Sequence, residues 1–151
     1  MREGPDVLVN AHGGERVIVR RRPDTGAGPL EMTLELTLPG AGPPEHAHPR
    51  QTERFRLRRG ALSVAVDGAE RELRAGDECV IPPGRAHRWV VLEPDTEVEL
   101  TVQPALRFEE VLERAFELVD RGAVGPDGVV DREPVEAFVA EFADEYRLLA
   151  P

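Results

Sequence analysis

The sequence predicts an all-β protein in which an antiparallel sandwich or barrel, over about residues 7–104, is followed by a pair of helices over about 105–150. Two observations predict the sheets: apolar and polar residues alternate in several short stretches, and turns rich in glycine and proline separate these stretches without a helical segment between them. A third observation predicts the helices, because the apolar period lengthens beyond Pro104. We therefore expect a single domain over 1–151 with one core.

The first strands lie before the proline-rich interruption of the chain. Gly4–Arg22 contains a short apolar lead-in, an NAHGG turn and the run ERVIVRRR, which we interpret as an edge strand closed by the loop PDTGAGP. His12 lies in the turn, where we expect a surface residue. From Leu30 to Leu38 every second residue is apolar, and this alternation predicts a nine-residue strand with one buried face.

A second alternating run follows the interruption. Glu53, Phe55 and Leu57 share one face of the predicted strand, which we expect to point inward. The arginines between and after them, at positions 54, 56 and 58, are expected to face solvent or to pair with glutamates of neighbouring strands.

Two further strand pairs complete the predicted barrel. ALSVAVDGAERELR places an Asp67-Gly68 pair between two short runs, which is the strongest hairpin signal in the chain. CVIPPGRAHRWVVL is a strand interrupted by a Pro-Gly turn, and a last strand, Thr96–Val102, ends at a proline. The residues that share a face after the Pro-Gly turn are His87, Trp89 and Val91.

Two amphipathic helices are predicted beyond the barrel. Gly122 is a plausible stop for the first, AVGPDGVVDRE is interpreted as a loop, and Pro134 suits the first turn of the second. We expect their apolar stripes to pack on the barrel or on each other. These stripes are Phe108, Val111, Leu112, Ala115, Phe116 and Val119 in the first helix, and Val135, Phe138, Val139, Phe142 and Leu149 in the second.

Composition excludes several classes of function. The net charge of −10 argues against nucleic acid and acidic membrane surfaces as partners, because their phosphates require a basic surface. The chain contains no lysine, which removes Schiff-base chemistry, and its only serine, Ser63, lies in a strand-like run without a nucleophile elbow. No apolar run approaches a membrane span and the first residues do not resemble a secretion signal, so we expect a cytoplasmic protein.

Histidine and carboxylate are the available metal ligands. Cys79 is the only cysteine, so a thiolate-based structural zinc site is excluded, and we expect it to be a small buried apolar residue. His46 and His48 are two residues apart and therefore point to the same side of a strand, with Glu53 and His87 as further ligands. Such a set suits one divalent transition metal ion, either Fe, Mn, Ni, Cu or Zn, and leaves coordination positions open for a substrate.

The spacing of these residues resembles that of the cupin superfamily. The match to its first motif consists of Gly40, His46, His48, Glu53 and Gly60, and the match to its second consists of Gly76, Pro82, Gly84 and His87. One departure is Val91, which stands where the second motif commonly ends with asparagine and makes the predicted cavity more apolar. The resemblance implies a double-stranded β-helix, or jelly-roll, barrel and a homodimer.

We expect a mononuclear metal enzyme with an apolar cavity. The resemblance favours a dioxygenase type, similar to the quercetin dioxygenases, that acts on a small aromatic or enolisable compound, with Glu53 as a candidate base. Alternatives are a non-redox metal cupin, such as an isomerase or polyketide cyclase, and a binding or sensing module without catalysis. The expected partner is thus a small molecule. The predicted cavity-lining residues are Phe55, Leu57, Trp89 and Val91.

Overall fold

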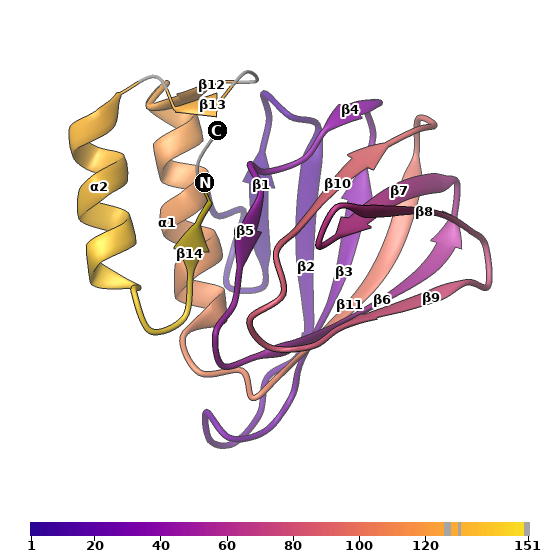
Figure 1. The fold of residues 1–151 in the computed structure, drawn as a ribbon, viewed down its shortest axis with the longest axis horizontal. Coiled ribbons are helices and arrows are strands. Elements are labelled where there is room, and N and C mark those ends of the chain that lie inside the picture. Colours follow the sequence, from indigo (N-terminus) through magenta and orange to yellow (C-terminus); the bar gives the residue numbers. More distant parts are fainter. Residues whose placement is uncertain (126–127, 130, 150–151) are drawn as a thin grey trace.

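Two antiparallel sheets face each other as a jelly roll, which confirms the predicted fold class (Figure 1). The computed structural model describes residues 1–125, 128–129 and 131–149. The first sheet contains, in spatial order, β1 (Val7–Asn10), β2 (Glu15–Arg21), β3 (Leu30–Leu36), β11 (Thr96–Gln103), β6 (Thr52–Arg59) and β9 (Glu78–Ile81). The second contains β14 (Arg147–Leu148), β5 (His46–Ala47), β10 (His87–Val91), β7 (Ala61–Val66) and β8 (Ala69–Arg74), and β4 (Gly40–Ala41) also pairs with β10.

The core lies between the inner faces of these sheets. On β6, Glu53, Phe55 and Leu57 are buried, while the arginines that alternate with them, at positions 54, 56 and 58, are exposed, as predicted. One of these arginines, Arg58, pairs with Glu99 of β11 at 2.7 Å. Exposed ion pairs of this kind contribute little to stability, so the apolar inner faces hold the sheets together.

Two predictions about the first strands were wrong. The edge of the sheet is β1, because β2 pairs with β1 on one side and with β3 on the other. The strand that begins at Leu30 ends at Leu36, two residues early, and Leu38 is exposed. The N–H and hydroxyl of Thr37 still donate to the Gly14 carbonyl in register with the ladder, but Gly14 has a φ of +65° and lies outside β2, so the pairing ends there.

Gly60 joins β6 to β7 at a point of close approach. Its φ is +86°, and a Cβ atom added there would lie 2.8 Å from the Thr96 Cα and would also overlap the Thr96 hydroxyl. We therefore expect Gly60→Ala to lower the free energy of unfolding by about 2–4 kcal/mol, from backbone strain and overpacking together. Chemical denaturation measures this loss.

Gly68 provides the matched control. It has a similar φ of +83° in the β7–β8 turn, where the Asp67-Gly68 hairpin forms as predicted, but an added Cβ would have no neighbour within 4 Å. Gly68→Ala should therefore cost only the backbone term of about 1–2 kcal/mol. Equal losses at the two glycines would contradict the importance of the Thr96 contact.

The helices are α1 (Phe108–Asp120) and α2 (Arg132–Glu141). As predicted, Gly122 ends the first: its φ is +75° and its N–H donates to the Val119 carbonyl. The second ends at Glu141, so Leu149 is not on a helix but follows β14, which was not predicted. The expected loop between the helices forms, in its described part, the hairpin of β12 (Val124–Gly125) and β13 (Gly128–Val129). Strands of two residues are too short to show an alternation of apolar and polar residues, so the sequence does not predict them.

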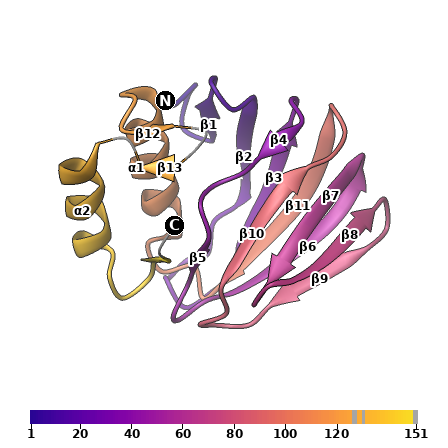
Figure 2. The same cartoon turned by 45° about the horizontal axis from the view of Figure 1, so that its top comes forward.

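The helices form a layer beside the barrel, with α1 between α2 and the sheets (Figure 2). Phe108 and Phe116 of α1 join the barrel core, and Val111 and Leu118 belong to a second apolar cluster shared with α2. Both expected modes of packing therefore occur. Within the described part of the chain, neither helix is long and apolar enough to cross a membrane.

Candidate metal centre

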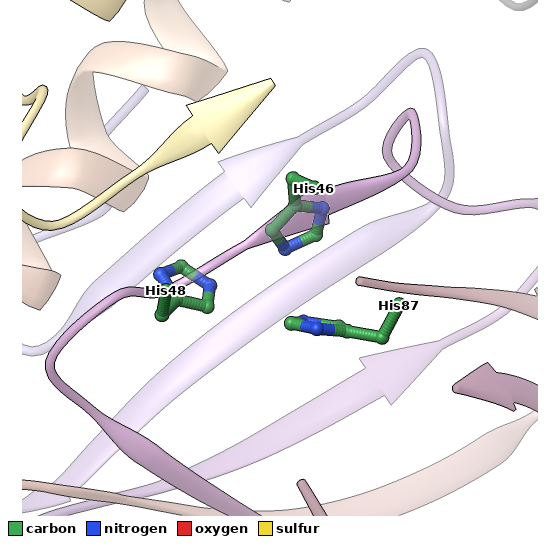
Figure 3. Close-up of side chains that lie close together, drawn as sticks. All are labelled: His46, His48 and His87. Carbon is green, nitrogen blue, oxygen red and sulfur yellow. The ribbon is translucent and has the colours of Figure 1, made fainter. Parts of the chain in front are cut away.

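Three buried histidines from two segments of the second sheet meet at one point (Figure 3). His46 lies on β5 and His48 follows that strand, while His87 is the first residue of β10 and pairs directly with His46. Their ligand atoms all lie within 4.8 Å of one another. The Pro-Gly turn before β10 returns the chain so that residues far apart in sequence share this point.

Main-chain carbonyls orient all three imidazole rings. Nδ1 of His46 lies 2.8 Å from the Pro44 carbonyl oxygen, and Nδ1 of His87 lies 3.0 Å from that of Arg85. Nδ1 of His48 lies 2.9 Å from the carbonyl oxygen of Glu145. Because a carbonyl only accepts hydrogen bonds, each Nδ1 carries the proton and each Nε2 has a lone pair available for a metal.

Glu53 adds a buried carboxylate to the group. Only 3% of this residue is exposed. Its Oε2 lies 2.8 Å from Nε2 of His87, and its Oε1 lies 3.5 Å from Nε2 of His48. Even so, Glu53 Oε2 and His87 Nε2 have no hydrogen-bond partner among the described residues. A buried carboxylate oxygen and a buried imidazole nitrogen without hydrogen-bond partners lower the stability of the fold unless a cation lies between them. This set of donor atoms therefore fits a divalent transition metal. Glu53 as the fourth ligand stays a prediction.

The electrostatics of the centre favour a neutral His46 and an ionised Glu53, and without a metal they shift His87 toward its protonated form. Burial, together with the neighbouring imidazoles, lowers the pKa of His46 to about 3, so its ring is neutral at neutral pH. Burial alone would raise the pKa of Glu53, but His48 and His87 outweigh it and lower that pKa to about 2. For His87, burial is outweighed by Glu53, which raises its pKa. The centre thus holds an ionised carboxylate that favours a positive charge beside it.

A cavity of about 860 Å³ opens from the centre. Phe55, Trp89 and Val91 line it, as do residues of α1 and α2. Leu57 was also expected in the lining, but it is fully buried in the core instead. The volume lies within the range of small-molecule sites, and most of the lining is apolar.

The C-terminal segment contributes to the centre in a way that the sequence analysis missed. β14 pairs with β5, so that Leu148 lies opposite His46. Glu145 supplies the carbonyl that orients His48, and the Tyr146 ring stacks on His46 with centroids 5.1 Å apart and planes at 20°. The one available signal was that Tyr146 is the only tyrosine in the chain.

His12 and Cys79 lie outside the centre. His12 is exposed in the turn between β1 and β2, where it lines the outer end of the cavity. Cys79 is half-buried on β9, less than the expected full burial, because β9 is the last strand of its sheet. Burial raises the pKa of its thiol, so it is not an activated nucleophile.

The fold and the centre together define a jelly-roll protein with a buried, histidine-rich site at the end of an apolar cavity. Residues 33–103 match the family model of the cupin domain. Over this segment the chain is therefore similar to cupin domains, in agreement with its jelly-roll fold.

Two curated relatives match part of the same region. A segment of 62 residues is 40% identical to the probable oxidoreductase patJ of Aspergillus clavatus. The same length is 39% identical to patJ of Penicillium expansum. The match covers 40% of this chain but spans only 19% of the length of either relative.

Three solved structures share the fold. KdgF from Halomonas sp. has a TM-score of 0.58 and 24% identity, covering 66% of this chain and 86% of that one. An RmlC-like cupin from Shewanella frigidimarina has a TM-score of 0.56 and 22% identity, with 70% and 88% covered. The nucleoside dehydratase Pac13 of Streptomyces has a TM-score of 0.56 and 15% identity, with 69% and 79% covered. At such identities the likeness concerns the fold alone.

Proposed function

We propose that this protein is a mononuclear metal-dependent enzyme of the dioxygenase type, acting on a small aromatic or enolisable compound. The observation that carries the proposal is the convergence of three oriented Nε2 atoms at the end of a largely apolar cavity. The name of the patJ relatives, probable oxidoreductase, supports redox chemistry. The few polar groups in the lining favour a compound with a large apolar surface over a sugar or nucleotide.

The residues of the chain have separate roles in this proposal. His46, His48 and His87 would hold the ion, which supplies Lewis acidity and, if it is redox-active, electron transfer. Glu53 either completes the ligand set or accepts a proton from an enolisable substrate, for which its ionised carboxylate is suited. Phe55 and Trp89 exclude water and offer flat faces to an aromatic ring.

A non-redox metal enzyme, such as an isomerase, is the second candidate. The observation that favours it is the pairing of acid and base near the centre: Glu53 is ionised, and burial raises the pKa of Tyr146, so the phenol stays protonated. Such a pair can move a proton between two positions of a substrate whose oxygen is polarised by zinc.

Metal reconstitution with oxygen measurement separates the candidates. Protein stripped of metal is loaded with Fe, Mn, Ni, Cu or Zn, and supplied with flavonols, catechols and β-diketones. We expect oxygen consumption with a redox-active ion and none with Zn. Turnover with Zn in the absence of oxygen would favour the second candidate, and ligand binding without turnover would favour a binding module. Failure to retain any of these metals would overturn the metal-based proposals.

We also propose a homodimer. β9 is the terminal strand of its sheet and carries the exposed Val80, which gives an edge able to pair with a second copy. The molar mass from light scattering tests this, and the mass of a single chain at micromolar concentration would contradict it.

A further inference from the structure

Glu15 is a carboxyl group inside the cavity that the metal centre does not use. It is the first residue of β2 and shares the inward face with Val17 and Val19. Its half-buried side chain lines the cavity, and no hydrogen bond or ion pair joins it to another side chain among the residues that the structure describes. In contrast, Glu35 on the outer face of the neighbouring strand is paired with Arg16 at 2.9 Å.

Strand register places Glu15 at the opposite end of the cavity from the metal centre. Glu53 pairs with Val102 of β11, whereas Glu15 pairs with Leu36, which pairs in turn with Thr96 of the same strand. The part of β11 between these two levels is about 20 Å long at the usual rise of an antiparallel strand. Glu15 and the metal centre are therefore two polar ends of one cavity.

The wall between these two ends is apolar. Proceeding from Glu15 toward Glu53, the cavity is lined on the first sheet by Leu36, Leu34 and then by the paired Leu100 and Phe55. In the part of the chain that the structure describes, no ion pair neutralises the Glu15 carboxyl, although His12 and Arg121 also line the cavity, and burial raises its pKa to about 7. A carboxyl in such a place destabilises the empty protein, and a ligand group that hydrogen-bonds to it removes that penalty.

We propose that Glu15 recognises the far end of the ligand, and that the ligand is an elongated, mostly apolar molecule whose aromatic or enolisable end carries the metal-binding oxygen atoms and whose other end carries an amino group. The inference rests on the proposed function, because the metal centre holds the first end. It goes further by naming the shape and the two polar ends of the ligand class.

Three fatty acids of equal chain length test the proposal: dodecanoate, ω-aminododecanoate and dodecanedioate. Their extended chains suit the span between the two ends, because the metal ligands and Glu15 both reach into the cavity. Binding to zinc-loaded protein of verified metal content is measured by calorimetry. We expect the amino acid to bind about tenfold more tightly than the dicarboxylic acid, as for a hydrogen bond between charged groups.

Substitution of Glu15 then identifies the residue responsible. In Glu15→Gln, which keeps the shape of the side chain, the preference for the amino acid should shrink to about twofold or less, since the charge-assisted part of the hydrogen bond is lost. Glu31→Gln is the matched control, because Glu31 lies on the outer face of β3 and its substitution changes the net charge equally. It should leave the preference intact.

The arms of the experiment separate this inference from the proposed function. Dodecanoate that binds equally well to metal-loaded and metal-free protein would count against the metal end, and thus against the proposed function. A preference for the amino acid that is absent, or that survives Glu15→Gln, would overturn the role of Glu15. Failure of all three acids to bind metal-loaded protein would overturn the elongated ligand class.

Discussion

We expect the replacement of His87 with alanine to abolish stoichiometric metal binding. The substitution removes one of three converging Nε2 atoms and leaves the buried Glu53 carboxylate without its neighbour at 2.8 Å. Loss of a direct ligand should weaken binding by more than the roughly 10–100-fold typical of residues behind the ligands. Metal content after dialysis, measured by mass spectrometry, and competition with a chromophoric chelator give the affinity.

Two further variants serve as a control and as a test of the Glu53 carboxylate. His12→Ala is the control, since His12 is an exposed histidine outside the centre, and it should retain full metal content. Glu53→Gln reports the role of the carboxylate: the loss of a fourth ligand should weaken metal affinity by more than about 100-fold, whereas the loss of a base alone should change it far less. Unaltered metal binding in His87→Ala, with the fold intact by circular dichroism, would refute the proposed centre.

Truncating Phe142 to alanine should destabilise the helical layer and also weaken the metal centre. Phe142 is 1% exposed in the cluster between the helices, and a buried phenylalanine of this kind contributes about 3–5 kcal/mol. Its carbonyl accepts the N–H groups of both Glu145 and Tyr146 at 2.8 Å, so it anchors the turn that reaches His48 and His46. Hydrogen exchange along 142–149, together with metal affinity, measures the effect.

Leu73→Ala is the matched control for this variant. Leu73 is fully buried in β8, away from the C-terminal segment, so its truncation should lower global stability by about 2–5 kcal/mol without a change in metal affinity. Tyr146→Phe, which keeps the ring stacked on His46, should likewise retain the metal. Equal losses of metal affinity in Phe142→Ala and Leu73→Ala would show that general stability is responsible.

The strands β3, β6 and β11 could be predicted from the sequence because each buries mainly one face. The alternation of apolar and polar residues around Phe55 and around Leu34 indicates which side chains face the core. Gly68 indicates a turn that requires a positive φ. The histidines could be assigned to one site because their spacing fixes strand parity, and because a Pro-Gly turn returns the chain before His87.

The remaining features depend on contacts that no local pattern encodes. β14 is two residues long, so neither its pairing with β5 nor the position of Tyr146 has a periodic signal. The end of β3 depends on its partner strand, because β2 begins only after Gly14, whose φ is +65°. Glu15 could have been assigned from the sequence, because it lies two residues before Val17 and therefore on the same inward face of the strand. A glutamate at such a position was the available signal for a polar group at the far end of the cavity.

The pairing of β14 with β5 also affects the order in which the protein folds and binds its metal. His48 and the carbonyl that orients it are 97 residues apart, so this contact closes a long loop and is expected late in folding. A barrel with only its local hairpins formed presents a looser set of imidazoles, and high affinity for the ion arises once β14 has docked. Because a metal that prefers the docked state stabilises it by mass action, a bound ion would hold β14 against β5.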